Sequence, residues 1–116
     1  MAAVPEISVR ELAARLRSQD EFVVLDVREQ FEIEAVSIDD PRVIVLPLSE
    51  IARLGLKGLP APVQARETPV LVLCHHGTRS AQVASWLVAS GWTHAFSVAG
   101  GIDAYAREVD PSVGLY

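Results

Sequence analysis

The hydrophobic residues of this chain are arranged in short apolar runs that alternate with segments of helical spacing. Four runs, rich in valine and leucine, predict buried strands at residues 22–27, 43–46, 70–73 and 95–98. Short strands that are apolar throughout and separated by helices are typical of a parallel sheet covered on both sides. The pattern therefore predicts an α/β fold, with a mainly parallel central sheet of about five strands and helices on both faces.

The segments between these runs carry recognisable helix signals. Ser8 and Glu11 form a capping-box pattern ahead of an apolar face. Further helices are expected at residues 29–35, at 49–54 with Ser49 as the N-cap, from Ser80 to about Gly91, and around 102–107. A chain of 116 residues is long enough to bury one core, so we expect one domain over residues 1–116.

Cys74 is the only cysteine, and it lies where the predicted strand 70–73 ends. Residues 74–79 form a six-residue loop before the helix expected from Ser80. A helix start supplies unpaired N–H groups and partial positive charge, and Arg79 adds a full positive charge. These features favour a thiolate, so Cys74 is a candidate nucleophile. The alternative is a small buried hydrophobic residue that closes the strand.

Other polar or flexible residues also follow predicted strands. Asp26 and Arg28 come at the end of the first apolar run, and Gly100–Gly101 follow the last. Chemistry in parallel sheets collects at the carboxyl ends of the strands, which is where Cys74 also lies. We expect Asp26 either to bind loop amides or to pair with an arginine, and the two glycines to let backbone pass close to the loop.

Composition narrows the range of functions. The formal net charge of −5 gives no basic surface for nucleic acid. No apolar run approaches the roughly 18 residues that span a membrane, and the first residues lack the features of a signal peptide. A single cysteine excludes an internal disulfide, which fits a reducing compartment. We therefore expect a cytoplasmic protein.

Three segments together resemble the single-domain rhodanese-like sulfurtransferases over nearly the whole chain. They are Val-Leu-Asp-Val-Arg-Glu at 24–29, Cys-His-His-Gly-Thr-Arg-Ser at 74–80, and Val-Ala-Gly-Gly-Ile at 98–102. One departure is the stretch 35–40, Ala-Val-Ser-Ile-Asp-Asp, where the family usually has a Gly-His-Ile-Pro-Gly-Ala-like sequence. The closing segment also resembles rhodanese domains that are fused to enzymes activating ubiquitin-like proteins.

The resemblance implies a sulfurtransferase that needs no cofactor. Cys74 would take a sulfane sulfur as a persulfide and pass it to a thiol or to cyanide. The donor would be thiosulfate or a persulfide on a small molecule or protein, and a ubiquitin-like sulfur-carrier system is a candidate partner. Arg79 would neutralise the charge of the donor. The implied substrate-binding residues are His75, His76, Gly77, Thr78, Arg79 and Ser80, with Asp26, Arg28, Gly100 and Gly101 in support.

Two other functions compete with this one. A binding or carrier module would accept sulfur only from a protein donor. A cysteine phosphatase would also hold an anion between strand and helix, but the related phosphatases have five residues between cysteine and arginine, and here only residues 75–78 intervene. A metal site is not expected, since the consecutive His75 and His76 rarely converge on one ion and no second cysteine exists.

Overall fold

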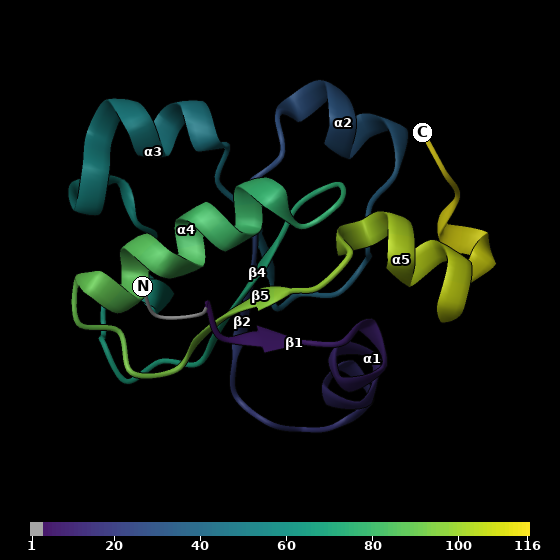
Figure 1. Ribbon diagram of the computed structural model, residues 1–116, viewed down its shortest axis with the longest axis horizontal. Helices are drawn as coiled ribbons and strands as arrows, with labels where there is room; N and C mark the ends of the chain where they lie inside the picture. The colour runs from purple at the N-terminus through teal and green to yellow at the C-terminus, as the bar shows by residue number, and fades with distance from the viewer. Residues whose placement is uncertain (1–3) are drawn as a thin grey trace.

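The computed structural model, which describes residues 4–116, contains a five-stranded parallel sheet (Figure 1). The strand order is β1-β5-β4-β2-β3, and every neighbouring pair is parallel. The strands are β1 (Glu6–Ile7), β2 (Val23–Asp26), β3 (Val43–Val45), β4 (Val70–Leu73) and β5 (Ala95–Val98). This confirms the predicted fold class; the two-residue edge strand β1 is too short to produce a hydrophobic run.

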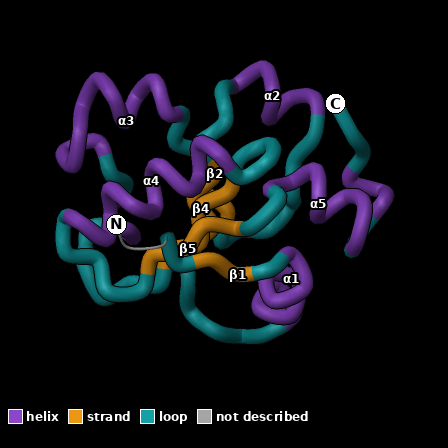
Figure 2. Tube along the Cα trace, in the orientation of Figure 1, coloured by secondary structure: helices purple, strands orange, loops and turns teal. Residues whose placement is uncertain are grey.

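Helices cover both faces of the sheet. They are α1 (Val9–Arg17), α2 (Gln30–Ala35), α3 (Leu48–Leu54), α4 (Thr78–Ala89) and α5 (Gly101–Glu108). The strands gather at the centre of the molecule, with α3 and α4 on one side and α1 and α5 on the other (Figures 1 and 2). Among residues 4–116, no helix has the length and apolar character needed to cross a membrane.

Alternation along the central strands divides the core into two clusters. Leu25 and Val72 point into the cluster beneath α3 and α4, whereas Val24 and Leu71 point into the cluster beneath α1 and α5. All four side chains are 0% exposed. Successive side chains of a strand point to opposite faces, so strands covered on both sides are apolar at every position.

The register of the sheet fixes where the site lies. Asp26 in β2 is paired with Leu73 in β4, and the Val27 amide donates to the Leu73 carbonyl at 2.9 Å. The two strands therefore end at the same level. The segments that follow them, which carry Arg28 and Cys74, leave the sheet side by side at its carboxyl edge.

Helix boundaries differ from the sequence-based expectation by one or two residues, and the starts of α4 and α3 have a clear physical reason. Helix α4 begins at Thr78 rather than at Ser80, because Gly77 adopts a φ of 105° and turns the chain directly into the helix. Helix α3 begins at Leu48 with Pro47 as its N-cap, so the prediction of Ser49 as the cap was wrong. The Ser49 hydroxyl instead donates to Glu29 at 2.8 Å. The capping box of Ser8 and Glu11 is confirmed.

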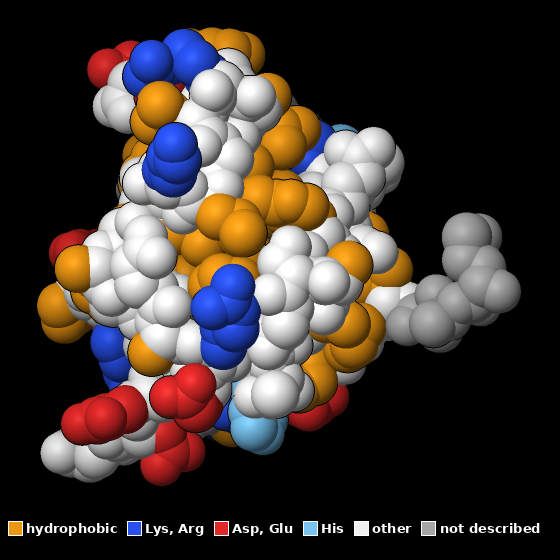
Figure 3. All heavy atoms as spheres, turned by 90° about the vertical axis from the view of Figure 1, so that its left-hand side faces the viewer, with side chains coloured by type: hydrophobic (Ala, Val, Ile, Leu, Met, Phe, Trp, Pro, Cys, Tyr) orange, Lys and Arg blue, Asp and Glu red, His pale blue; other side chains and the backbone are white. Residues whose placement is uncertain are grey.

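An apolar groove separates α3 from α4. Figure 3 shows hydrophobic side chains gathered in a hollow on this face. The cavity has a volume of about 340 Å³. Its lining is formed mainly by Leu48, Ile51, Ala52, Val83 and Trp86.

The first turn of α5 is bound directly to the loop that follows β4. The amides of Ile102 and Asp103 donate to the carbonyls of Cys74 and His75 at 2.9 and 3.1 Å. A β carbon on Gly101 would lie 2.4 Å from both of these carbonyl oxygens, and the residue has a φ of 62°. Only glycine permits this approach, because both the backbone angle and the available space exclude a side chain.

We predict that Gly101→Ala is much more destabilising than Gly55→Ala. Both positions have positive φ, but a β carbon on Gly55 would meet nothing within 4 Å. Gly55→Ala should therefore cost only backbone strain, about 1–3 kcal/mol, since its φ of 63° and ψ of −148° suit almost no residue but glycine. Gly101→Ala adds to backbone strain a clash with two backbone carbonyls, which should cost about 1–3 kcal/mol more. Urea unfolding of the two variants measures the difference, and equal losses would contradict the proposed close approach.

Candidate active site

The sulfur of Cys74 is held at the N-terminus of α4. The side chain is 1% exposed. Its Sγ accepts hydrogen bonds from the Gly77 amide at 3.1 Å and the Ser80 amide at 3.3 Å. Backbone N–H groups and the positive end of a helix dipole both stabilise negative charge on an atom placed there. The burial alone would suit a core cysteine, but a core cysteine has no need of two amide donors directed at its sulfur.

Two buried hydroxyl groups extend this arrangement. The Cys74 thiol donates to Ser80 Oγ at 3.3 Å, and Ser80 Oγ lies 2.8 Å from Ser97 Oγ. Ser80 Oγ also donates to the Gly77 carbonyl at 3.1 Å. Ser97 was not predicted as a site residue, although one polar residue in the otherwise apolar strand β5 is a usable signal. Such a network can reorient its protons when the charge of the sulfur changes.

Arg79 lies in the first turn of α4, but its guanidinium is bound to a carboxylate. Its two terminal nitrogens donate to the two oxygens of Glu32 at 2.7 and 2.8 Å. The sequence predicts that Arg79 binds the donor, and it gives no sign of Glu32, which lies 47 residues away in α2. The hydrogen bonds from Arg79, opposed by burial and aided by the Glu29 amide, lower the pKa of Glu32 to about 2.

Asp26 and Arg28 form a second ion pair at the end of β2. Arg28 donates from Nη2 and Nε to the two Asp26 oxygens at 2.8 and 3.0 Å, and both side chains are buried. Arg28 Nη1 also donates to the Glu32 carbonyl at 3.4 Å and to Tyr116 Oη at 3.2 Å. Of the two roles considered for Asp26, the structure shows pairing with an arginine.

The C-terminal segment returns to this edge of the sheet. Tyr116 Oη donates to Glu32 Oε1 at 2.9 Å, and the Tyr116 ring stacks on His75 with centroids 4.0 Å apart. His75 in turn stacks on His76 at 3.8 Å. Burial, followed by the charge of His76, lowers the pKa of His75, which favours its neutral form. No sequence pattern pointed to Tyr116.

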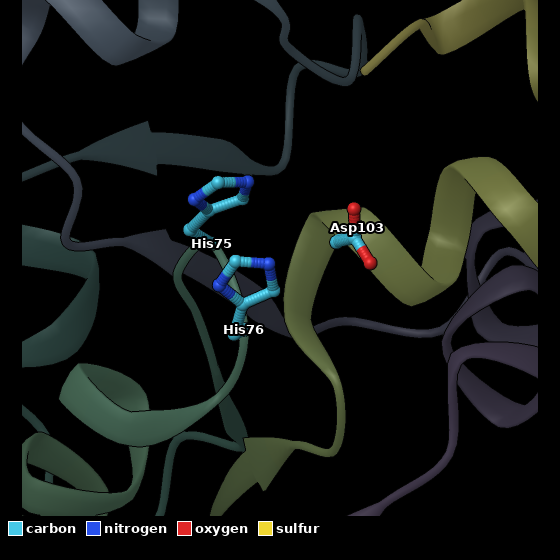
Figure 4. A group of neighbouring side chains, drawn as sticks. All are labelled: His75, His76 and Asp103. Atoms are coloured by element: carbon cyan, nitrogen blue, oxygen red, sulfur yellow. The ribbon is translucent and has the colours of Figure 1, made fainter. Parts of the chain in front are cut away.

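His75, His76 and Asp103 are the residues here that could hold a metal ion. Figure 4 shows Asp103 on α5 opposite the two imidazole rings, and their candidate ligand atoms lie within 4.8 Å of one another. However, the Asp103 carboxylate already accepts from Arg107 at 3.0 Å, and the rings are stacked rather than directed at one point. We assign no metal to this group.

The remaining sequence-predicted residues lie in the loop or pack against it. Thr78 is exposed. A β carbon on Gly77 would lie 3.2 Å from the Gly100 amide nitrogen, so these two turns pack closely. The structure thus directs the amides of Gly77 and Ser80 at the Cys74 sulfur. It holds Arg79, Asp26 and Arg28 in ion pairs at the same edge of the sheet.

Comparison with known proteins gives a consistent result. The family described as "Rhodanese-like domain" matches residues 8–108. A protein named "Sulfurtransferase" from Allochromatium vinosum is 30% identical over 114 residues, which cover 95% of both chains. The chloroplastic "Rhodanese-like/PpiC domain-containing protein 12" of Arabidopsis thaliana is 38% identical, and the match covers 97% of this chain but only 38% of the plant protein. Matches to MoeZ of Mycobacterium tuberculosis likewise cover 26% of that protein.

Solved structures show the same fold. A rhodanese-related protein from Thermoplasma volcanium has a TM-score of 0.72 and 32% identity, with coverage of 90% of this chain and 93% of that one. The human single-domain sulfurtransferase TSTD1 has a TM-score of 0.73 and 25% identity, with coverage of 90% and 96%.

The Glu32–Arg79 pair predicts a specific acid sensitivity. A carboxylate whose pKa is lowered from 4.5 to about 2 contributes stability that is fully present above pH 4.5 and is lost as the pH falls toward 2. We expect Glu32→Gln to remove this contribution, on the order of 3 kcal/mol. Urea unfolding at pH 6 and pH 2.5 should show the wild type losing more stability than the variant. Glu34→Gln, an exposed change in the same helix, serves as the control and should behave like the wild type.

Proposed function

The chain belongs to the rhodanese-like domain family, and we propose that it is a sulfurtransferase that carries a sulfane sulfur on Cys74. The observation that carries the proposal is the pair of amides, from Gly77 and Ser80, that donate to the sulfur at the N-terminus of α4. The match to residues 8–108 and the likeness to a protein named "Sulfurtransferase" support the same reaction class.

In the first step the Cys74 thiolate attacks the outer sulfur of the donor. With a persulfide donor R–S–SH, a new bond forms between Cys74 Sγ and the outer sulfur, the donor's S–S bond breaks, and R–S⁻ leaves with the bonding electron pair. With thiosulfate, the same attack releases sulfite. The sulfur moves as a neutral atom in both cases, so the step needs no external oxidant or reductant.

The loop supplies further donors for the outer sulfur. Within residues 4–116, the amides of His76, Thr78 and Arg79 make no backbone hydrogen bond. A persulfide places its outer sulfur one bond beyond Sγ, where these N–H groups could stabilise its negative charge. The inner sulfur would keep the amides of Gly77 and Ser80.

In the second step an acceptor thiolate attacks the outer sulfur and restores the Cys74 thiolate. The acceptor is a thiol of a small molecule or a protein, or cyanide. In the relative named probable adenylyltransferase/sulfurtransferase MoeZ, the match covers 26% of the protein, which fits a domain that works beside another protein activity. The protein partner that we propose is a ubiquitin-like sulfur carrier. A module that takes sulfur only from such a partner is the alternative, and it would give no turnover with small donors.

We predict that Cys74 is indispensable for sulfur uptake. Incubation with thiosulfate or glutathione persulfide should increase the intact mass of the wild type by one sulfur atom, and reduction should reverse it. Cys74→Ser should show no gain, while far-UV circular dichroism shows that the fold is retained. Because the chain has no other cysteine, the added sulfur can be assigned without mapping. Sulfur transfer by the Cys74→Ser variant would refute the proposal.

A second prediction separates sulfur transfer from phosphate hydrolysis. The four residues between Cys74 and Arg79 form a tighter ring than the phosphatases need, and Arg79 is already bound to Glu32. The wild type should therefore give no measurable hydrolysis of an aryl phosphate. One residue inserted after Gly77 should enlarge the ring and reduce sulfur transfer, since reacting groups must be held in line. Aryl phosphate hydrolysis without any sulfur uptake would establish the phosphatase instead.

A further inference from the structure

The positive charges beside the sulfur are already neutralised. Arg28 is paired with Asp26 in a buried position, and Arg79 binds both oxygens of Glu32. The two ion pairs leave no net charge on these four side chains. His75, next to the sulfur in the sequence, has a lowered pKa because of burial, so it adds no charge at neutral pH. Among residues 4–116, the two arginines at this edge of the sheet are therefore not free to bind an anion.

Arg79 cannot turn to an anionic donor at low cost. Its side chain is 29% exposed, but that of Glu32 is only 8% exposed. If Arg79 released Glu32, a poorly hydrated carboxylate would lose its main partner, which is strongly unfavourable for a buried pair. Tyr116 Oη and the Glu29 amide also donate to this carboxylate, so they hold Glu32 where it meets Arg79.

The two donor classes differ in the charge that they bring to the thiolate. Thiosulfate is a dianion, and the sulfite that it releases is also one, so three negative charges share the site throughout the transfer. A persulfide R–S–SH brings no charge at the reacting sulfurs, or one when it is ionised. Like charges at short distance in a poorly hydrated site repel strongly unless cations are present.

We propose that Glu32 is a specificity determinant: by holding Arg79 it disfavours dianionic donors and directs Cys74 to persulfide donors. This inference rests on the proposed sulfurtransferase function. The donor class is an organic persulfide, on a small molecule or on a protein cysteine. A persulfide's two reacting sulfurs need only the backbone amides of the loop and no free cation.

The test is a gain of function. Glu32→Gln removes the carboxylate charge, and its single amide oxygen can still accept from either Tyr116 or the Glu29 amide, which donate to different oxygens of Glu32. Arg79 then becomes available for the donor. We expect kcat/KM for thiosulfate to rise about tenfold or more, as for a new charge-assisted contact. The value for glutathione persulfide should change much less, so the ratio of the two donors shifts toward thiosulfate. In the wild type the ratio should favour the persulfide.

Two further variants isolate the cause. Glu34→Gln makes the same change of charge at an exposed position of α2 and should leave the donor ratio as in the wild type. Arg79→Ala added to Glu32→Gln should abolish the gain, because the freed guanidinium is its source. A gain that survives without Arg79 would overturn the role assigned to the pair.

The outcomes distinguish this inference from the proposed function. If no donor adds sulfur to Cys74, the sulfurtransferase assignment fails. If sulfur is added but the wild type uses thiosulfate as well as the persulfide, or if Glu32→Gln leaves the ratio unchanged, only the role of Glu32 fails. Should that variant not fold, the wild type still provides a test. Its thiosulfate kcat/KM should depend little on salt, and a steep fall between low and high ionic strength would contradict a neutral site.

Discussion

The register between β2 and β4 places Asp26 opposite Leu73, and the arrangement of the site follows from it. Because the two buried strands end at one level, the chain after β2 carries Arg28 and then Glu32 to the same edge that receives Cys74. The strands themselves are immobilised by apolar packing on both faces. Rigid strands with functional loops at their carboxyl ends are how parallel sheets position chemistry.

Two helix N-termini then define the loop from opposite sides. Helix α4 directs amides at the sulfur, while α5 directs amides at the carbonyls of Cys74 and His75. The carbonyls that would repel a negative sulfur are thus turned toward α5 and occupied there. The same loop can present N–H groups inward because its oxygens have partners outside it.

Much of the fold and of the loop around Cys74 could be predicted from the sequence alone, for physical reasons. Short runs that are apolar at every position predict four of the five strands, and the turn at Gly77 and the amides of α4 follow from the local sequence around Cys74. The partner of Arg79 could not be predicted from the sequence. A local sequence pattern does not show which acidic residue of a distant helix lies against the guanidinium. Tyr116 and the two-residue β1 carry no periodic signal. Helix α4 begins two residues earlier than predicted, because its helical hydrogen bonding starts before the first residue of its apolar face.

Cys74 is a lone buried cysteine, and this limits how a sulfur atom bound to it could leave. Within these 116 residues no second thiol exists to attack a loaded Cys74, so a persulfide formed there cannot be discharged by closing a disulfide inside the domain. With 1% of the residue exposed, the sulfur is also poorly placed to join another copy of itself. If Cys74 carries sulfur as proposed, each molecule has one thiol to carry it, and only a nucleophile from outside these 116 residues can remove it.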